Sequence, residues 1–553
     1  MGLSALVVML ATEPLLAIVW DEGYTLGRQE RIRNWFRGLR DPAGFAARWT
    51  PPSPLEELVQ KVAGELPPRP DQIDSRRELL LDPGVVAYFW PFAREEPHGH
   101  PPFYAVLGLM GDLLAPSWKP LPRARLGPIL LFSLTAALLF RFVAVRWGSW
   151  AGIAAAGSWL LQPNLFGHGH YATYDAVLAS LWVLAIVAFA GSIRELENGP
   201  LTHRRVRWLA SVGFGVVVGC ALATKLTGWF LPVPFVLWTL WFRPQDGLRS
   251  LLVGGVVAVL VLYLLVPPWW TEPITGPLRF FQSNLTRGRT IPIPVLFLGK
   301  VYQTPNESLP WYNTLIWTFL VTPVGFLGLG GAGLYRAARG LRTEPLGVLI
   351  VLHWLLLIGL RALPHTPGHD GVRLFLPAFG MLAMLAGIGR RRDSWREGPG
   401  FRLAVSAALV EGVASLVVFM PVPLSYYSPL VGSLPGAARI GMEPTYYWDA
   451  LGPEARRWLR EHTGPTETIR FSSFPTSWLY LRSEGELPRL FPIDAGSIAW
   501  YVLQNRGGAW SREERRLVAA ATPAFTVTKL GVPLIWIFPI SETERILRPP
   551  RGP

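Results

Sequence analysis

The chain has 553 residues, of which 50% are hydrophobic and only 16% are charged. A soluble globular chain carries charge on about 25% of its residues, so much of this surface is expected to face something other than water. The formal net charge of +14 does not indicate a nucleic-acid partner, because the basic residues punctuate apolar segments instead of clustering on one soluble face. The single cysteine, Cys220, excludes an intramolecular disulfide and a thiolate metal cluster.

Apolar segments of roughly 20 residues, the length that crosses a bilayer, recur along the first 420 residues. Segment 3–19 lacks the basic start and cleavage site of a signal peptide, so we expect a first transmembrane helix there. Glu13-Pro14 interrupts this segment, which leaves open a start codon placed too late. The shorter stretch 102–116 contains Asp112 and is expected to form an interfacial or juxtamembrane helix. In all we predict eleven spans, at residues 3–19, 126–146, 149–165, 175–191, 208–224, 229–242, 249–266, 311–334, 346–363, 374–389 and 401–420.

The distribution of arginine predicts the orientation of these spans. With the N-terminus in the cytoplasm, 16 basic residues fall in the predicted cytoplasmic loops, whereas the short outer loops near 166–174, 225–228 and 364–373 hold only Lys225 and Arg373. An excess of basic residues in cytoplasmic loops is typical of integral membrane proteins. We therefore expect a protein of the cell or inner membrane, with a cytoplasmic N-terminus and an extracytoplasmic functional face.

Two long loops and the C-terminal segment lie outside the membrane in this topology. The first outer loop covers 21–125 with juxtamembrane helices, and the second covers 267–310. Residues 421–553 are expected to form a small soluble extracytoplasmic α/β domain, because amphipathic segments alternate there with β-rich runs. The helices are expected at 452–462 and 511–520, and the strands at 467–472, 499–503 and 523–538. The predicted fold is an α-helical polytopic membrane domain, 1–420, followed by this α/β domain.

Ionisable and aromatic residues gather at the predicted outer ends of the spans. Each group alone has an ordinary explanation, such as a solvated acid pair, an N-cap at Asp175 or a snorkelling Lys225. Together they bring acids and cations to one surface, as transfer of a group from a phosphate leaving group requires. A carboxylate orients or deprotonates the acceptor, and Arg or Lys neutralises the departing phosphate. The candidates are Asp21, Glu22, His98, His100, Tyr104, His168, His170, Asp175, Lys225, His369 and Arg373.

Several stretches of sequence, together with Asp21-Glu22 directly after the first span, carry a resemblance to a known family. They are HPPFY (100–104), YATYDAVLASLW (171–182), ALATKLTGWFLPVP (221–234), LPWYNTLIWTFLVTPVGFLGLG (309–330) and HDGVRLFLPAFGMLAMLAGIG (369–389). In this order the chain resembles the GT-C glycosyltransferases, in particular family 39-like members similar to protein O-mannosyltransferases and lipid A aminoarabinose transferases. The resemblance covers residues 1–420. It implies a GT-C fold and transfer of a sugar from a polyprenyl-phosphate donor to a hydroxyl acceptor on a protein, lipid or glycan.

The resemblance also implies roles for individual residues. Asp21, with Glu22 beside it, matches the first-loop acid that acts as catalytic base or orients the acceptor. Asp175 matches the acid at the second outer junction. Arg373 matches the basic residue that contacts the lipid phosphate, with assistance from Lys225. Substrate-binding residues are expected at His100, Tyr104, His170 and His369.

A divalent metal is a further possibility, because the chain has more histidines beside these acids than the family pattern demands. Neutral imidazoles and carboxylates are good ligands for zinc or manganese. The candidate ligands are Asp21, Asp175, His98 and His168. Many similar proteins need no metal, so no cofactor is required by this interpretation.

Two other functions stay open on the sequence. A transporter or flippase of a lipid-linked substrate usually has acids near the middle of the bilayer. Apart from Asp175 at the outer end of its span, the only acids inside the predicted spans are Glu13 and Glu411, and no inverted repeat is evident. An inactive relative that serves as an assembly subunit through residues 421–553 is the other alternative.

Overall fold

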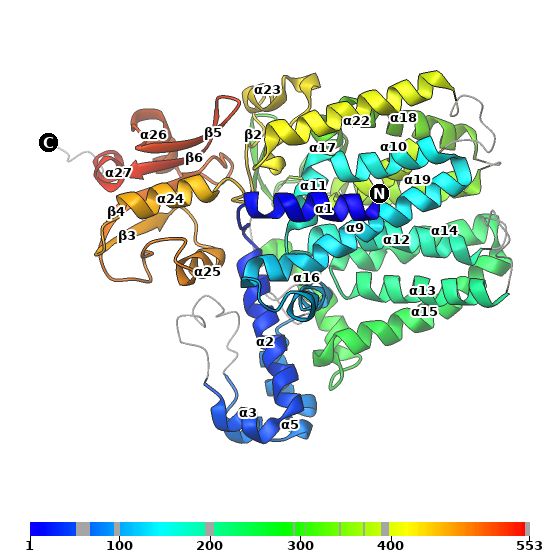
Figure 1. The fold of residues 1–553 in the computed structure, drawn as a ribbon, viewed down its shortest axis with the longest axis horizontal. Coiled ribbons are helices and arrows are strands. Elements are labelled where there is room, and N and C mark those ends of the chain that lie inside the picture. Colours follow the sequence, from blue (N-terminus) through cyan, green and yellow to red (C-terminus); the bar gives the residue numbers. More distant parts are fainter. Residues whose placement is uncertain are drawn as a thin grey trace.

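The computed structural model describes residues 1–50, 67–92, 100–193, 204–290, 293–304, 306–341, 344–368, 371–388 and 398–547. It consists of a bundle of apolar helices, a group of short helices from the first outer loop, and a small sheet unit near the C-terminus (Figure 1). In Figure 1 the bundle helices run side by side across the right of the view. The sheet unit lies beyond their left-hand end, and α2 (Glu22–Arg40) projects downward from that end.

The bundle is built from apolar helices of unequal length. Among the described residues, five helices are long and apolar enough to cross a membrane: α9 (Pro120–Trp147), α12 (Tyr174–Ser192), α15 (Pro244–Leu265), α19 (Pro345–Ala362) and α22 (Pro399–Phe419). The remaining bundle helices are α1 (Gly2–Thr12), α10 (Ser149–Leu161), α11 (Pro163–His170), α13 (Arg204–Leu222), α14 (Pro232–Phe242), α17 (Asn313–Val321), α18 (Val324–Arg339) and α20 (Pro377–Gly387). The polytopic helical fold is as predicted, but the expected number of eleven full spans is not confirmed.

Proline accounts for the interrupted spans. Pro14 lies in a short 3-10 turn that ends α1, so this helix does not continue through the predicted span 3–19. Pro163 separates α10 from α11, and Pro323 separates α17 from α18 within the predicted span 311–334. Proline cannot donate a backbone hydrogen bond, and it disfavours helical geometry in the residue before it. Hydropathy alone does not detect these breaks, because the residues on both sides of each proline are apolar.

The two acids inside the predicted spans both have structural partners. Glu411 accepts hydrogen bonds from the backbone N–H groups of Val324 and Gly325, at 2.7 and 2.6 Å, where α18 begins. The first N–H groups of a helix have no partner within it, and negative charge is favourable at that end. Glu13 contacts the guanidinium of Arg125 at 3.0 Å. These contacts give both acids a structural role in the folding of the bundle, which explains why they lie inside predicted spans.

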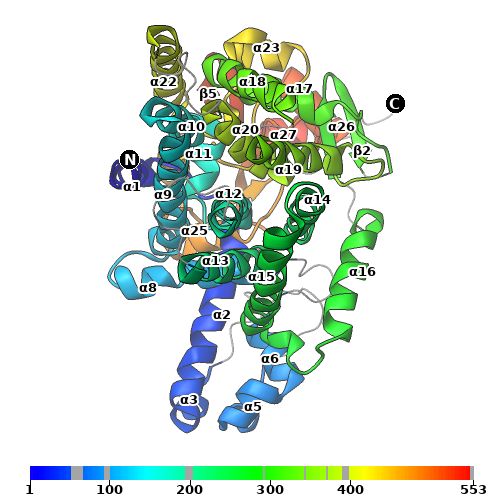
Figure 2. The ribbon, with the colours of Figure 1, turned by 90° about the vertical axis from the view of Figure 1, so that its right-hand side faces the viewer.

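The segments predicted to be outer loops form short elements at one end of the bundle. The expected interfacial helix at 102–116 is present as α7 (Phe103–Gly108) and α8 (Met110–Leu114), which pack against α9. Figure 2 shows the lower part of α2 projecting below the bundle together with α3 (Pro42–Arg48), α5 (Arg76–Leu81) and α6 (Pro83–Phe89). The second outer loop contains α16 (Thr275–Thr290) and an antiparallel hairpin of β1 (Ile293–Phe297) and β2 (Lys300–Thr304).

The C-terminal unit contains a four-stranded sheet of order β3-β4-β6-β5, in which β3 and β4 are parallel and the other pairs antiparallel. The predicted helices and strands are confirmed, and the run 523–538 is a hairpin that turns at Leu530-Gly531, both with positive φ. The elements that follow α23 (Ser433–Arg439) are α24 (Pro453–His462), β3 (Glu467–Phe471), α25 (Ser477–Ser483), β4 (Ser497–Gln504), α26 (Arg512–Ala520), β5 (Phe525–Lys529), β6 (Val532–Pro539) and α27 (Ile540–Leu547).

Candidate functional site

Two acids and two cations from four distant segments meet where α2 and α12 begin. Arg373 lies between the acids: its Nε donates to Oδ2 of Asp175 at 2.8 Å, and its Nη2 contacts Oδ2 of Asp21. Lys225 donates from Nζ to Oδ1 of Asp175 at 2.7 Å. The side chain of Asp175 is fully buried, whereas that of Asp21 is 20% exposed. Four residues singled out in the sequence therefore converge, and Asp21 is the acid that an incoming group can reach.

Asp175 is stabilised as an anion by its place in the fold. It is the second residue of α12, and it follows Tyr174 directly. A carboxylate in the first turn of a helix interacts favourably with the positive end of the helix dipole. With Lys225 on one oxygen and Arg373 on the other, both of its oxygens are occupied. Asp175 is thus suited to hold the two cations in place.

Two tyrosines complete the surroundings of Asp21. The hydroxyls of Tyr174 and Tyr447 donate to its Oδ2 at 2.8 and 2.7 Å. The guanidinium of Arg373 lies 3.9 Å from the ring centroid of Tyr447 and also donates to the hydroxyl of Tyr174 at 2.9 Å. Burial alone would raise the pKa of Asp21, but the charge of Arg373 and the two hydroxyls outweigh it and hold that pKa below its ordinary value.

Tyr447 comes from the segment between α23 and α24, so residues after the last bundle helix contribute directly to the site. Its neighbour Tyr446 packs over Gly371, where a Cβ atom would meet the tyrosine ring at 2.7 Å. Gly371 also has a φ of +53°, a conformation that glycine adopts without steric cost. A glycine two residues before Arg373 therefore allows the C-terminal segment to approach the cation closely.

The HPPFY stretch reaches the site through Tyr174. The ring of His100 lies 4.0 Å from that of Tyr174, and the ring of Tyr104 meets it edge-on at 5.4 Å. The hydroxyl of Tyr104 accepts a hydrogen bond from Nη1 of Arg28 at 2.7 Å. His98 and His369 lie outside the described residues.

The two histidines of α11 have different surroundings. Nε2 of His168 is 3.4 Å from the hydroxyl of Tyr446, and its ring lies 5.8 Å from that of Tyr447, so it borders the acid–cation cluster. His170 faces another way. Its Nδ1 is 2.8 Å from the carbonyl of Phe166, and its Nε2 is 3.1 Å from the carbonyl of Met9. These contacts place His170 in the packing of α11 against α1, apart from the cluster.

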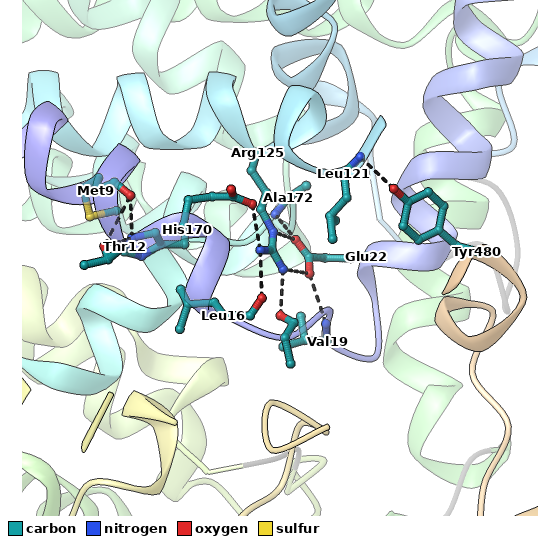
Figure 3. Close-up of polar contacts among 12 residues, drawn as sticks. Met9, Thr12, Leu16, Val19, Glu22, Leu121, Arg125, His170, Ala172 and Tyr480 are labelled. Carbon is teal, nitrogen blue, oxygen red and sulfur yellow. Dashed lines mark hydrogen bonds and ion pairs between the residues drawn. The ribbon is translucent and has the colours of Figure 1, made fainter. Parts of the chain in front are cut away.

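Glu22 does not join Asp21 in the acid–cation cluster but lies in a second network with Arg125 (Figure 3). Nε and Nη2 of Arg125 donate to its two carboxylate oxygens, each at 2.7 Å. The same oxygens accept from the backbone N–H groups of Val19 at 3.0 Å and Ala172 at 2.9 Å. Arg125 and Glu22 are both fully buried. With four donors on its carboxylate, Glu22 is a structural group that ties the turn before α2 to α9 and to the start of α12.

The described residues do not assemble the metal site that the sequence left possible. Within the described ranges, no group of three or more His, Cys, Asp and Glu side chains comes together in a way that could hold a metal ion. Asp21 and Asp175, two of the candidate ligands, are bound instead by Arg373 and Lys225. The described part of this donor set therefore does not fit a divalent cation.

Four residues of these networks were not singled out in the sequence. Tyr174 adjoins Asp175 in a quoted motif, and Tyr447 belongs to the aromatic run TYYW in the C-terminal segment. Arg28 falls two helical turns after Asp21, a spacing that places both on one face of a helix. Arg125 immediately precedes an apolar span, where a basic residue is usually read as a boundary.

Comparison with known proteins places this geometry in context. Residues 100–270 match the family described as dolichyl-phosphate-mannose-protein mannosyltransferase. The undecaprenyl phosphate-alpha-4-amino-4-deoxy-L-arabinose arabinosyl transferase 1 of Pseudomonas fluorescens is 31% identical over 163 residues, which span 27% of this chain and 25% of that protein. ArnT from Cupriavidus metallidurans in the apo state has a TM-score of 0.50 and 15% identity, covering 97% of this chain and 96% of ArnT.

The chain has the GT-C type of fold, as ArnT does. The fold likeness to ArnT extends along nearly the whole of both chains, whereas the sequence match to the arabinosyl transferase spans about a quarter of that protein. ArnT bound to undecaprenyl phosphate gives a TM-score of 0.49 at 15% identity over the same shares. The match to the family model includes Asp175 and Lys225, while Asp21 and Arg373 lie outside it. The GT-C fold expected from the sequence is confirmed.

Proposed function

We propose that this chain is a membrane glycosyltransferase that moves a sugar from a polyprenyl-phosphate donor to a hydroxyl acceptor. The observation that carries the proposal is the convergence of Asp21, Asp175, Arg373 and Lys225 at one end of the helix bundle. The names of the matched family and of the arabinosyl transferase both describe a sugar joined to a polyprenyl phosphate. This agreement supports the same class of donor for this chain, with a protein, lipid or glycan hydroxyl as acceptor.

In the proposed mechanism Asp21 orients the acceptor. Its carboxylate accepts a hydrogen bond from the acceptor hydroxyl and takes the proton as that oxygen attacks the anomeric carbon. The bond from this carbon to the phosphate oxygen breaks, and its electron pair leaves with the polyprenyl phosphate. A single displacement of this kind inverts the configuration at the anomeric carbon.

The timing of proton transfer follows from the charge around Asp21. Because Arg373 and the tyrosine hydroxyls lower the pKa of Asp21, the carboxylate is ionised at neutral pH and is a weak base. It takes the proton late, once bond formation has made the attacking hydroxyl acidic. Arg373 and Lys225 would meanwhile stabilise the negative charge that develops on the departing phosphate.

We place this site on the extracytoplasmic side of the membrane, because the predicted cytoplasmic loops hold most of the basic residues flanking the spans. A donor carried on a lipid suits such a site, since it is held at the membrane surface. The bilayer is then a partner in catalysis, with the polyprenyl chain between the helices and the sugar phosphate beside Asp21.

The structural roles of Glu13 and Glu411 favour the transferase over a transporter or flippase. Each acid has a partner that explains it through folding, so neither is needed as a coupling group for transport. An inactive assembly subunit would not need a partly exposed carboxylate beside two buried cations. The experiment below separates these alternatives, because only the transferase forms a product.

The direct test is sugar transfer by the purified chain in liposomes that contain polyprenyl phosphates carrying radiolabelled aminoarabinose or mannose, with membrane and peptide acceptors supplied. We expect one donor to be consumed, with loss of activity by about 10²- to 10⁴-fold in Asp21→Asn. Asp74→Asn alters an exposed acid in the same outer loop and is the matched control. Full activity of Asp21→Asn would overturn the assigned role, and an absence of transfer from every donor would count against the function.

A further inference from the structure

Arg28 is a cation of the site that has no acid of its own. It lies on α2, seven residues after Asp21, so the two side chains share one face of the helix. Side chains on a helix lean toward its N-terminus, which directs Arg28 back toward Asp21. Its Nη1 donates to the hydroxyl of Tyr104 at 2.7 Å, and its guanidinium lies 5.2 Å from the ring centroid of Phe92.

The other basic residues of this region are already occupied. Arg33, on the same helix, forms an ion pair with Asp112 at 2.8 Å, and Arg31 donates to the carbonyl of Tyr88 at 2.8 Å. Arg373 and Lys225 bind the two acids of the cluster. Among the described residues, no acid forms an ion pair with Arg28.

Aromatic side chains join Arg28 to the cluster. Tyr104, which accepts its hydrogen bond, meets Tyr174 edge-on at 5.4 Å, and Tyr174 donates to Asp21 at 2.8 Å. Burial opposes the charge of Arg28, but Tyr104 and Asp21 raise its pKa above the ordinary value, so it remains a cation. Among the described residues, three cations therefore face two acids, which leaves an excess of one positive charge in a partly buried site. A buried excess charge is costly unless an ion of opposite sign binds.

We propose that Arg28 binds the phosphate of the lipid-linked substrate, and that its positive charge adds to those of Arg373 and Lys225, which Asp21 and Asp175 partly neutralise. This inference rests on the proposed function for the identity of the lipid. Guanidinium is well suited to the role, because its planar N–H groups pair with two phosphate oxygens at once. The ligand chemistry is a phosphate monoester or diester, whether or not a sugar is attached.

The test is equilibrium binding of radiolabelled undecaprenyl phosphate to the full-length purified protein, with Arg28→Gln compared with Arg33→Gln. Both substitutions remove one arginine from α2, but only the first removes the unpaired charge. We expect Arg28→Gln to weaken binding by at least about tenfold, as loss of a charge-assisted hydrogen bond does, and Arg33→Gln to change it by less than about twofold. Arg28→Lys should bind with intermediate affinity, because lysine keeps the positive charge but cannot pair with two phosphate oxygens at once as guanidinium does.

Two further ligands identify what Arg28 recognises. Undecaprenol, which has no phosphate, should bind wild type and Arg28→Gln equally weakly. Inorganic phosphate should compete at the wild-type site if the anion alone is recognised, and should fail to compete if the polyprenyl chain is also required. Either result supports the role of Arg28, provided that Arg28→Gln weakens binding of undecaprenyl phosphate. Equal affinity of Arg28→Gln and wild type for undecaprenyl phosphate would overturn the proposal. A parallel loss of undecaprenol binding would overturn it as well, because the effect would then be structural.

The outcome for Arg28 is separable from that for sugar transfer. If the wild-type chain binds undecaprenyl phosphate through Arg28 but transfers no sugar, the proposed function fails and the phosphate site stands. If the chain transfers sugar and Arg28→Gln keeps the wild-type KM for the donor, the function stands and the role of Arg28 is refuted. Melting temperatures of the variants confirm that each comparison is made on folded protein.

Discussion

Arg125 and Glu22 form a two-point ion pair in the interior, with Nε and Nη2 of the arginine each 2.7 Å from a different carboxylate oxygen. Arg125 also donates to the carbonyl of Ala17 at 2.7 Å, on the turn that leads into α2. Asp21 is on the same turn. The pair therefore fixes the backbone from which Asp21 reaches Arg373, and it explains why two adjacent acids point to different places.

Removing one member of this pair should destabilise the protein. In Arg125→Met the buried Glu22 keeps its charge without its main partner, which costs about 3–5 kcal/mol in comparable buried pairs. We expect a lower melting temperature together with reduced transfer activity, because the turn that carries Asp21 loosens. The double variant Arg125→Met/Glu22→Met removes both charges of the pair and leaves only Glu13 without its cation, so it should recover part of the stability. If the double variant were as unstable as the sum of the single changes, the pairing would not be the cause.

The hydroxyl of Tyr447 should control the acid limb of the pH–activity profile. This hydroxyl donates to Asp21 and helps to lower the pKa of that carboxyl. Tyr447→Phe should therefore raise the pKa of Asp21 toward its ordinary value. As the pH falls, the variant would then lose the active carboxylate at a higher pH than wild type. The measurement is kcat/KM against pH, with Tyr501→Phe, which changes a hydroxyl bonded to Glu514 in the sheet unit, as the control. Superimposable profiles for Tyr447→Phe and wild type would contradict this assignment.

Asp449 should limit stability at neutral pH. Burial raises its pKa to about 6, although its Oδ1 accepts a hydrogen bond from Thr445 at 3.0 Å. Because the folded pKa is above the unfolded value near 4, the favourable protonated form is present below about pH 4, and its benefit is lost as the pH rises through 6. Asp449→Asn keeps a carbonyl oxygen for Thr445 and removes the charge, so it should raise the melting temperature at pH 8 more than at pH 4. A difference of two pKa units between the folded and unfolded states corresponds to at most about 3 kcal/mol in the free energy of unfolding. An equal shift at both pH values would show that ionisation is not responsible.

The sidedness of the site can be tested with single cysteines. In a Cys220→Ala background, Glu513→Cys lies exposed on α26, and Arg339→Cys lies exposed at the end of α18. A maleimide that cannot cross membranes should label the first in intact cells, and the second only after permeabilisation, because Arg339 is predicted to be cytoplasmic. The reverse pattern would invert the proposed orientation.

The sequence allowed Asp21, Asp175, Lys225 and Arg373 to be identified together, because each lies where an apolar run meets a predicted outer loop. Charge at such a boundary is easy to recognise, and the contacts between segments far apart in sequence follow from bundle geometry. The divergence of Glu22 from Asp21 could not be predicted, since it depends on Arg125, which lies 103 residues away in the chain.

Tyr447 and the helix breaks show two other limits of prediction. Tyr447 lies in an aromatic run without helical or strand periodicity, so nothing local directed it toward the bundle. Pro323 interrupts the predicted span 311–334, but the apolar residues on both sides of it keep the hydropathy of that segment high. The elements of the small α/β unit were easier to predict from the sequence, because α24 and α26 are amphipathic and the strands alternate with them.

The dependence of the site on Tyr447 has a consequence for biosynthesis. Ribosomes make the chain from its N-terminus, so Asp21, Asp175 and Arg373 are all present well before Tyr447 emerges. The Oγ of Ser477, made later still, donates to the carbonyl of Val19 at 2.7 Å on the turn that bears Asp21. A nascent chain that already holds the whole bundle therefore lacks part of the shell around its key carboxylate. If the proposed function holds, competence for sugar transfer would arrive only with the last fifth of translation, after Tyr447 has been made.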